Sequence, residues 1–132
     1  MGPINYLAVF LGALAFFAVG AVWYSLLFGK AWQKLVGLSE EQIKGANMPM
    51  IFGLCFVAEL VISWMLGHQI ARTSPPPHVI MMFALGFAGA LMIPAIAINY
   101  LFQRKPLKLF LIDSGHFLVG LAAMGAVHRA LY

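Results

Sequence analysis

Four long apolar stretches dominate the sequence and restrict the folds that it can adopt. A helix needs about 20 mostly apolar residues to cross the hydrocarbon core of a bilayer. Strands of a membrane β-barrel would instead alternate apolar and polar residues in short segments, and the four stretches show no such alternation. We therefore predict an all-α integral membrane protein whose four transmembrane helices form an antiparallel bundle, at about residues 4–28, 48–70, 78–102 and 109–131.

The charge content of the chain supports the same fold class. Only 9% of the 132 residues are charged and 63% are hydrophobic, whereas soluble domains carry about 25% charged residues. So few charges cannot cover the surface of a soluble protein, so we expect the lipid bilayer to surround a single membrane domain, residues 1–132. The net charge of +4 does not predict a nucleic-acid partner, because the basic residues lie between apolar runs, where they set topology.

The connections between the stretches carry their own signals. Residues 29–47 form the longest predicted loop, and its LSEEQ segment places Ser39 three residues ahead of Gln42. This spacing is typical of a capping box and predicts a short interfacial helix. Pro94 lies inside the third stretch, where a proline is expected to kink the helix.

Lysine and arginine are distributed unevenly between the two sides of the predicted bundle. Arg72 and Arg129 lie on one side. Loops that face the cytoplasm carry an excess of these residues. We therefore expect both termini outside the cytoplasm, because the other side holds Lys30, Lys34, Lys44, Arg104, Lys105 and Lys108.

Two segments resemble a known family. The run GAVWYSLLFGKAWQKLVGLSEE at 20–41 and the run PLKLFLIDSGHFLVGLAAMGAV at 106–127 are similar to domain-of-unknown-function family 1761. The resemblance implies a small bacterial protein with four membrane helices and a Trp-Tyr-Ser motif near the end of the first helix. It also implies a multi-pass protein of the bacterial cytoplasmic (inner) membrane, and it implies no established activity.

Glu59 is the most unusual residue of the second stretch. It lies 11 residues after Met48, which places it roughly 16 Å into the membrane at about 1.5 Å per residue. A charge at the bilayer centre costs about 2.5–3.5 kcal/mol even on insertion scales. Two interpretations remain open: Glu59 relays protons or cations, or it is a neutral group that hydrogen-bonds between helices.

Asp113 and His116 lie in the first two turns of the fourth stretch, three residues apart, so they share one face of a helix. A carboxylate beside an imidazole can stabilise the charged ring and so move protons or hold a cation. The alternative is a polar cap near the lipid head groups, in which Asp113 pairs with Arg104, Lys105 or Lys108.

Other polar residues are expected at the same depth as Asp113. If these faces converge, a polar cavity open to the cytoplasm would end at Glu59. The alternative for the aromatic side chains is the belt that membrane proteins form at the interface. The further candidates are Trp23, Tyr24 and Ser25 at the end of the first helix, and Asn99 and Tyr100 at the end of the third.

The remaining signals favour neither metal nor catalytic chemistry. His68, His78 and His128 lie near helix ends without close ligand spacing, so we interpret them as interfacial and expect no metal site. There is no glycine-rich phosphate loop and no nucleophile with a base at suitable spacing, and we therefore expect no cofactor and no enzyme activity.

Two functional hypotheses follow from these residues. The first is an oligomeric transporter or channel for protons or small solutes that uses Glu59, assembled as a homodimer or larger homo-oligomer because four helices enclose little space. The alternative is a non-catalytic membrane scaffold or partner subunit, in which the polar residues are contacts between helices.

Overall fold

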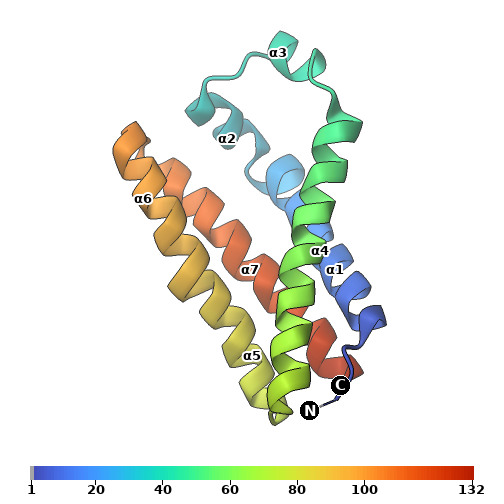
Figure 1. Ribbon diagram of the computed structural model, residues 1–132. Helices are drawn as coiled ribbons and strands as arrows, with labels where there is room; N and C mark the ends of the chain where they lie inside the picture. Colours follow the sequence, from blue (N-terminus) through green and yellow to red (C-terminus); the bar gives the residue numbers. More distant parts are fainter. Residues whose placement is uncertain (1) are drawn as a thin grey trace.

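The computed structural model describes residues 2–132 of the protein and is shown as a ribbon in Figure 1. These residues contain helices and no strands. Four helices are long and apolar enough to cross a membrane, at Tyr6–Leu27, Met48–Thr73, Pro77–Gln103 and Leu107–Leu131. The predicted all-α membrane fold with four transmembrane helices is thereby confirmed.

Two of the four long helices change their pitch along their length. The first consists of α1 (Tyr6–Val22) and a π-helical turn, η1 (Trp23–Leu27); the third consists of α5 (Pro77–Gly86), η2 (Phe87–Met92) and α6 (Ile93–Gln103). The second and fourth are the uninterrupted helices α4 (Met48–Thr73) and α7 (Leu107–Leu131). Between the first two long helices lie the short helices α2 (Gly29–Val36) and α3 (Glu40–Lys44).

Side-chain caps fix where several helices begin. The amide oxygen of Asn5 accepts from the backbone N–H of Ala8 at 3.2 Å at the start of α1. Ser39 and Gln42 form the predicted capping box of α3, with bonds of 3.1 and 2.8 Å. Such caps satisfy backbone N–H groups that have no partner inside the helix.

The π-helical turn η2 lies directly ahead of Pro94, the second residue of α6. Proline cannot donate a backbone hydrogen bond, and its ring crowds the carbonyl group four residues earlier. A wider turn is one way in which a helix accommodates such a break. The irregularity expected from Pro94 thus takes the form of a π-helical turn in the preceding six residues.

Helix α7 is the most buried of the four and packs against both α1 and α5, while α4 packs mainly against α1. The core lies between these helices. It consists of Phe16, Leu66, Ile70, Ile80, Ala84, Ala88, Leu121 and Met124. Large apolar side chains also cover the outer surface of α4 and α6, as expected for helices that face lipid.

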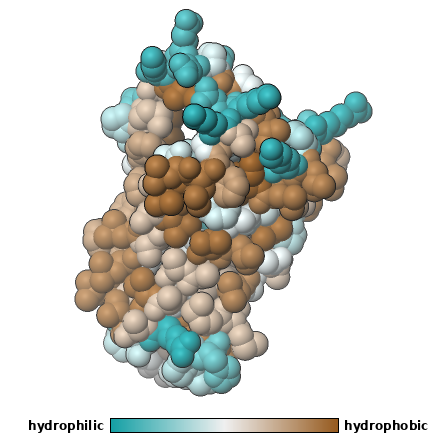
Figure 2. All heavy atoms as spheres, turned by 180° about the vertical axis from the view of Figure 1, so that it is seen from behind, coloured by the Kyte–Doolittle hydropathy of each residue, from teal (hydrophilic) through white to brown (hydrophobic). Residues whose placement is uncertain are grey.

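The bundle has two distinct ends (Figure 1). We call the end that carries α2, α3 and residues 104–106 the loop end, and the end that carries residues 2–5, residues 74–76 and the last turn of α7 the terminal end. Figure 2 shows hydrophilic atoms gathered at both ends of the molecule, with hydrophobic atoms between them. This distribution is typical of a protein whose middle lies in lipid.

Candidate functional site

Asp113 lies in the second turn of α7 and is only 7% exposed. Its two carboxylate oxygens accept hydrogen bonds from different tyrosines: the hydroxyl of Tyr24 donates to Oδ1, and the hydroxyl of Tyr100 donates to Oδ2. Tyr24 belongs to η1 and Tyr100 to α6. Three of the four long helices therefore meet at one carboxylate, and we call Asp113, Tyr24 and Tyr100 the dityrosine site.

The π-helical turn η1 is the element that brings Tyr24 to this position. Its defining bond runs from the N–H of Phe28 to the carbonyl of Trp23, five residues earlier, at 2.8 Å. The indole Nε1 of Trp23 donates to the carbonyl of Ile112 at 2.9 Å, and its ring lies on Gly115, where a Cβ would come within 2.8 Å of it. Single π-helical turns are frequent at functional sites.

His116 lies one turn farther along α7 than Asp113. Its ring is 4.9 Å from the ring of Tyr24 and 5.2 Å from that of Phe16, measured between centroids. Nε2 faces Gly20 of α1 and has no hydrogen-bond partner among the described residues. His116 and Asp113 do share a helix face, and Tyr24 contacts both of them.

Asp113 does not have the neighbours expected of a polar cap near the lipid head groups, in which it would pair with a basic residue. Within residues 2–132, no lysine or arginine nitrogen lies within the 4.0 Å of an ion pair with it. Arg104, Lys105 and Lys108 are all exposed, because the hydrated head-group region is available to their long side chains. In the structure the hydrogen-bond partners of Asp113 are instead two tyrosine hydroxyls, and its pairing with one of these cations stays a prediction.

Aromatic side chains enclose the dityrosine site on the side of the loop end. The rings of Trp32 in α2 and Tyr24 lie 5.7 Å apart, and those of Trp23 and Phe28 lie 4.8 Å apart. Helix α2 contacts α7 as well as η1. The short amphipathic α2 therefore covers the site from the loop end.

Two of the residues predicted from sequence lie outside this cluster. Ser25 is exposed, and its hydroxyl donates to the carbonyl of Ala21 in its own helix. Asn99 is also exposed. Each is adjacent in sequence to a tyrosine of the site, and neighbouring residues of a helix do not face the same way.

Glu59 lies apart from the dityrosine site, in α4. It is half-buried, and its Oε2 is buried without a hydrogen-bond partner in the described part of the chain. Ser63 follows one turn later and therefore shares its helix face. Glu59 is nearer to the terminal end than Asp113 is. Its Oε2 is one of four buried side-chain atoms without a hydrogen-bond partner among the described residues; the others are Oγ of Ser114, Nε2 of His116 and Nδ1 of His128.

A second polar centre, which the sequence did not predict, lies toward the terminal end. The hydroxyl of Ser63 and Nε2 of His128 are hydrogen-bonded at 2.9 Å, and both residues are 0% exposed. His128 lies in the last turn of α7 and is nevertheless enclosed, because Gly12 and Gly67 let α1 and α4 approach α7 closely around its ring. Small residues, which are common at close helix contacts, are the one sequence signal of this location.

The chemistry available at the dityrosine site is limited to its oxygens and the nearby imidazole. Residues 2–132 contain no group of three or more His, Cys, Asp or Glu side chains arranged to hold a metal ion. A carboxylate with two hydroxyl partners can instead accept a proton, or bind a small cation if the hydroxyls turn to coordinate it.

Comparison with known proteins places the chain in a family. A family model described as "Protein of unknown function (DUF1761)" matches residues 7–129. No curated protein and no solved structure matches the chain at a significant level. The match covers almost the whole chain, including every residue of the dityrosine site. The chain therefore belongs to the DUF1761 family of proteins of unknown function.

Proposed function

We propose that the protein is a small transporter or channel for protons or small cationic solutes, acting as a homo-oligomer, in which Asp113 and Glu59 take up and release the transported proton or cation. The observation that carries this proposal is the buried carboxylate of Asp113, which two tyrosine hydroxyls bind and no basic residue neutralises.

The energetic cost of this carboxylate supports exchange of a proton or cation. A charged side chain within a membrane helix costs about 2.5–3.5 kcal/mol on insertion scales, and two hydroxyl donors recover only part of that cost. Uptake of a proton converts the carboxylate to a neutral acid, whose O–H can then donate a hydrogen bond that a tyrosine hydroxyl accepts. The two states of Asp113 differ in charge and in hydrogen bonding. A group that takes up and releases a transported proton or cation requires such a difference.

Other polar atoms inside the bundle support a path from the dityrosine site. Nε2 of His116 and Oε2 of Glu59 are buried and have no hydrogen-bond partner among residues 2–132. They come from α7 and α4, on either side of α1. Buried polar atoms are nearly always paired, so these two are candidates to bind a transported proton or its water.

The proposal includes assembly and location. Helix α4 leaves most of its surface uncovered, and a second copy placed there would enclose Glu59 between subunits. The proposed location is the bacterial inner membrane with the loop end in the cytoplasm, because six basic residues lie there and Arg72 and Arg129 lie at the other end.

Proton flux into liposomes tests the transport proposal. Purified protein is reconstituted with an internal pH-sensitive dye, and a membrane potential drives entry. We expect flux above that of protein-free liposomes, its loss in Asp113→Asn and Glu59→Gln, and its retention in Glu41→Gln, an exposed acid of α3. Parent protein that is folded yet carries no proton or small cation would contradict the proposal.

A second candidate function is a non-catalytic scaffold or partner subunit. The Tyr24–Asp113–Tyr100 contacts favour it, since they join three long helices and would serve equally well as structural hydrogen bonds. In that case Asp113→Asn would lower the thermal stability of the purified protein, and the parent protein would show no flux. Flux that is lost while stability is kept distinguishes transport from this role.

A further inference from the structure

We propose that the terminal end carries a binding site for the head group of an anionic phospholipid, with Arg72 and His68 of α4 as its phosphate ligands. This site is separate from the dityrosine site and does not depend on the proposed transport.

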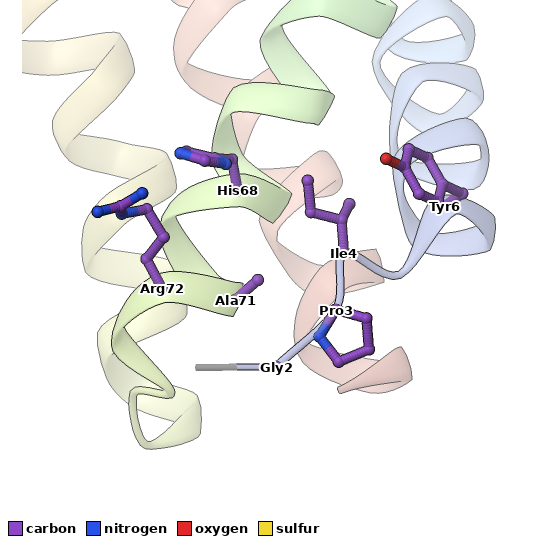
Figure 3. Close-up of a pocket in the computed structure, with 7 residues that line it drawn as sticks. All are labelled: Gly2, Pro3, Ile4, Tyr6, His68, Ala71 and Arg72. Carbon is purple, nitrogen blue, oxygen red and sulfur yellow. The ribbon is translucent and has the colours of Figure 1, made fainter.

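The site is an open hollow of about 570 Å³ at the last turns of α4. Figure 3 shows the side chains of His68 and Arg72 one above the other on one side of Ala71, with Pro3, Ile4 and Tyr6 on the other side. The two nitrogen-bearing side chains lie four residues apart, so they project from the same helix face. One wall is therefore cationic and polar, and the opposite wall is largely apolar.

Hydrogen bonds hold the apolar wall in place. The N–H of Gly2 donates to the carbonyl of Ala71 at 3.0 Å, which fixes the N-terminal segment against α4. The side-chain amide of Asn5 donates to the carbonyl of Leu131 at 2.9 Å, and the hydroxyl of Tyr132 accepts from the N–H of Asn5 at 3.0 Å. The hollow is thus formed before any ligand binds.

The charge distribution of the chain indicates an anionic ligand. The protein has four acidic residues. Glu40 and Glu41 lie in α3 at the loop end, and Glu59 and Asp113 lie within the membrane-spanning helices. No acidic side chain is therefore available at the terminal end to neutralise Arg72, which is exposed. Arginine binds phosphate well, because its planar guanidinium can donate two parallel hydrogen bonds.

The depth of the hollow indicates a lipid rather than a free anion. The 26 residues of α4 span about 39 Å, which exceeds the roughly 30 Å hydrocarbon core. The last turn with Arg72 therefore reaches the head-group layer. Trp64, which is 40% exposed, stacks on His68 at 5.4 Å one turn deeper in the membrane. The apolar wall beside Arg72 and His68 fits the glycerol and upper acyl groups of a phospholipid.

Native mass spectrometry of the detergent-purified protein tests the proposal. Phosphatidylglycerol and phosphatidylcholine are titrated separately against the parent protein and four variants, Arg72→Gln, Arg72→Lys, His68→Gln and Arg129→Gln. We expect the parent to prefer phosphatidylglycerol. Arg72→Gln should weaken its binding about fivefold, the effect of one arginine near an anionic lipid. Arg72→Lys should weaken the binding of phosphatidylglycerol less than Arg72→Gln does. Arg129→Gln is the matched control, because Arg129 is an exposed arginine at the same end but does not line the hollow.

Three results would overturn the proposal. Equal losses in Arg72→Gln and Arg129→Gln would indicate general surface charge, and unchanged binding in Arg72→Gln and His68→Gln would exclude both ligands. Displacement of phosphatidylglycerol by millimolar inorganic phosphate would identify a free-anion site instead. Thermal unfolding of each variant shows that it is folded, and Arg72→Lys keeps the test decisive if Arg72→Gln does not fold.

Discussion

Asp113 and His128 both lie on α7 and are both buried, but their partners differ. Asp113 meets two tyrosine hydroxyls from η1 and α6, whereas His128 meets the single hydroxyl of Ser63 from α4. The two residues are separated by 15 positions of one helix, or about 22 Å. One centre is built around a group that becomes charged when it loses a proton, and the other around a fully enclosed imidazole and an alcohol.

An apolar layer separates the two centres. Phe16 packs against Gly120, where a Cβ would lie 2.7 Å from its ring, and Leu121 and Met124 are completely buried beside it. No described polar side chain of α7 bridges this layer. We propose a division of roles, in which the His128 centre joins helices and the dityrosine site takes up and releases the proton or cation.

The largest expected effect on stability is at the terminal end. His128→Ala leaves the hydroxyl of Ser63 unpaired and opens a cavity, so we expect a loss of about 2–4 kcal/mol in unfolding free energy. Unfolding in detergent measures it. The control is His78→Ala at the same end, where the exposed histidine should contribute little. Similar losses of unfolding free energy in both variants would contradict the conclusion that Ser63 and His128 form an enclosed pair.

Gly12 tests how closely the helices must approach around His128. A Cβ at this position would lie 2.7 Å from Oγ of Ser63 and 3.0 Å from Nε2 of His128. We expect Gly12→Ala to cost about 1–3 kcal/mol through overpacking. Gly53→Ala in α4, where no atom lies within 4 Å, should instead be neutral or slightly stabilising. Equal changes in thermal stability for Gly12→Ala and Gly53→Ala would contradict a close approach of the helices around His128.

Tyr24 tests the bond to Asp113 at the loop end. Tyr24→Phe removes one donor to the carboxylate, and we expect a loss of about 1–2 kcal/mol, since hydrogen bonds between membrane helices contribute modestly. The same substitution should cost less in an Asp113→Asn background, because the two residues act together. Additive losses in this double-mutant cycle would show that the two side chains do not interact.

Ser25 should show the smallest effect, although it adjoins Tyr24. Its hydroxyl bonds only to the carbonyl of Ala21 in the same helix. We therefore expect Ser25→Ala to change the unfolding free energy by less than about 0.5 kcal/mol and to leave proton flux unchanged. A loss as large as that of Tyr24→Phe would place Ser25 in the dityrosine site, contrary to its position.

The sequence predicted the loop-end site better than the terminal-end centre, and the reason is physical. Four long apolar runs fix the helices, and the three-residue spacing of Asp113 and His116 fixes their common face. Ser25 and Asn99 were included because depth in the membrane is readable from sequence, whereas the direction of a side chain depends on the register of packed helices. The π-helical turn η1 changes that register without a proline inside it.

The His128 centre depends on contacts among three helices that no local pattern encodes. Ser63 and His128 are 65 residues apart, and each resembles an ordinary polar residue near a helix end or face. Only the glycines at positions 12 and 67 indicate that the helices approach closely there. The pairing itself follows from the three-dimensional packing of α1, α4 and α7.

The proposed transport requires that Asp113 change its protonation inside the bundle. Infrared difference spectroscopy of the protein in lipid membranes, between acidic and alkaline buffer, measures the carbonyl band of protonated carboxyl groups. We expect a band component that is absent in Asp113→Asn and unchanged in Glu41→Gln. A spectrum in which Asp113→Asn has no effect would contradict the claim, and the dityrosine site would then be a structural contact only.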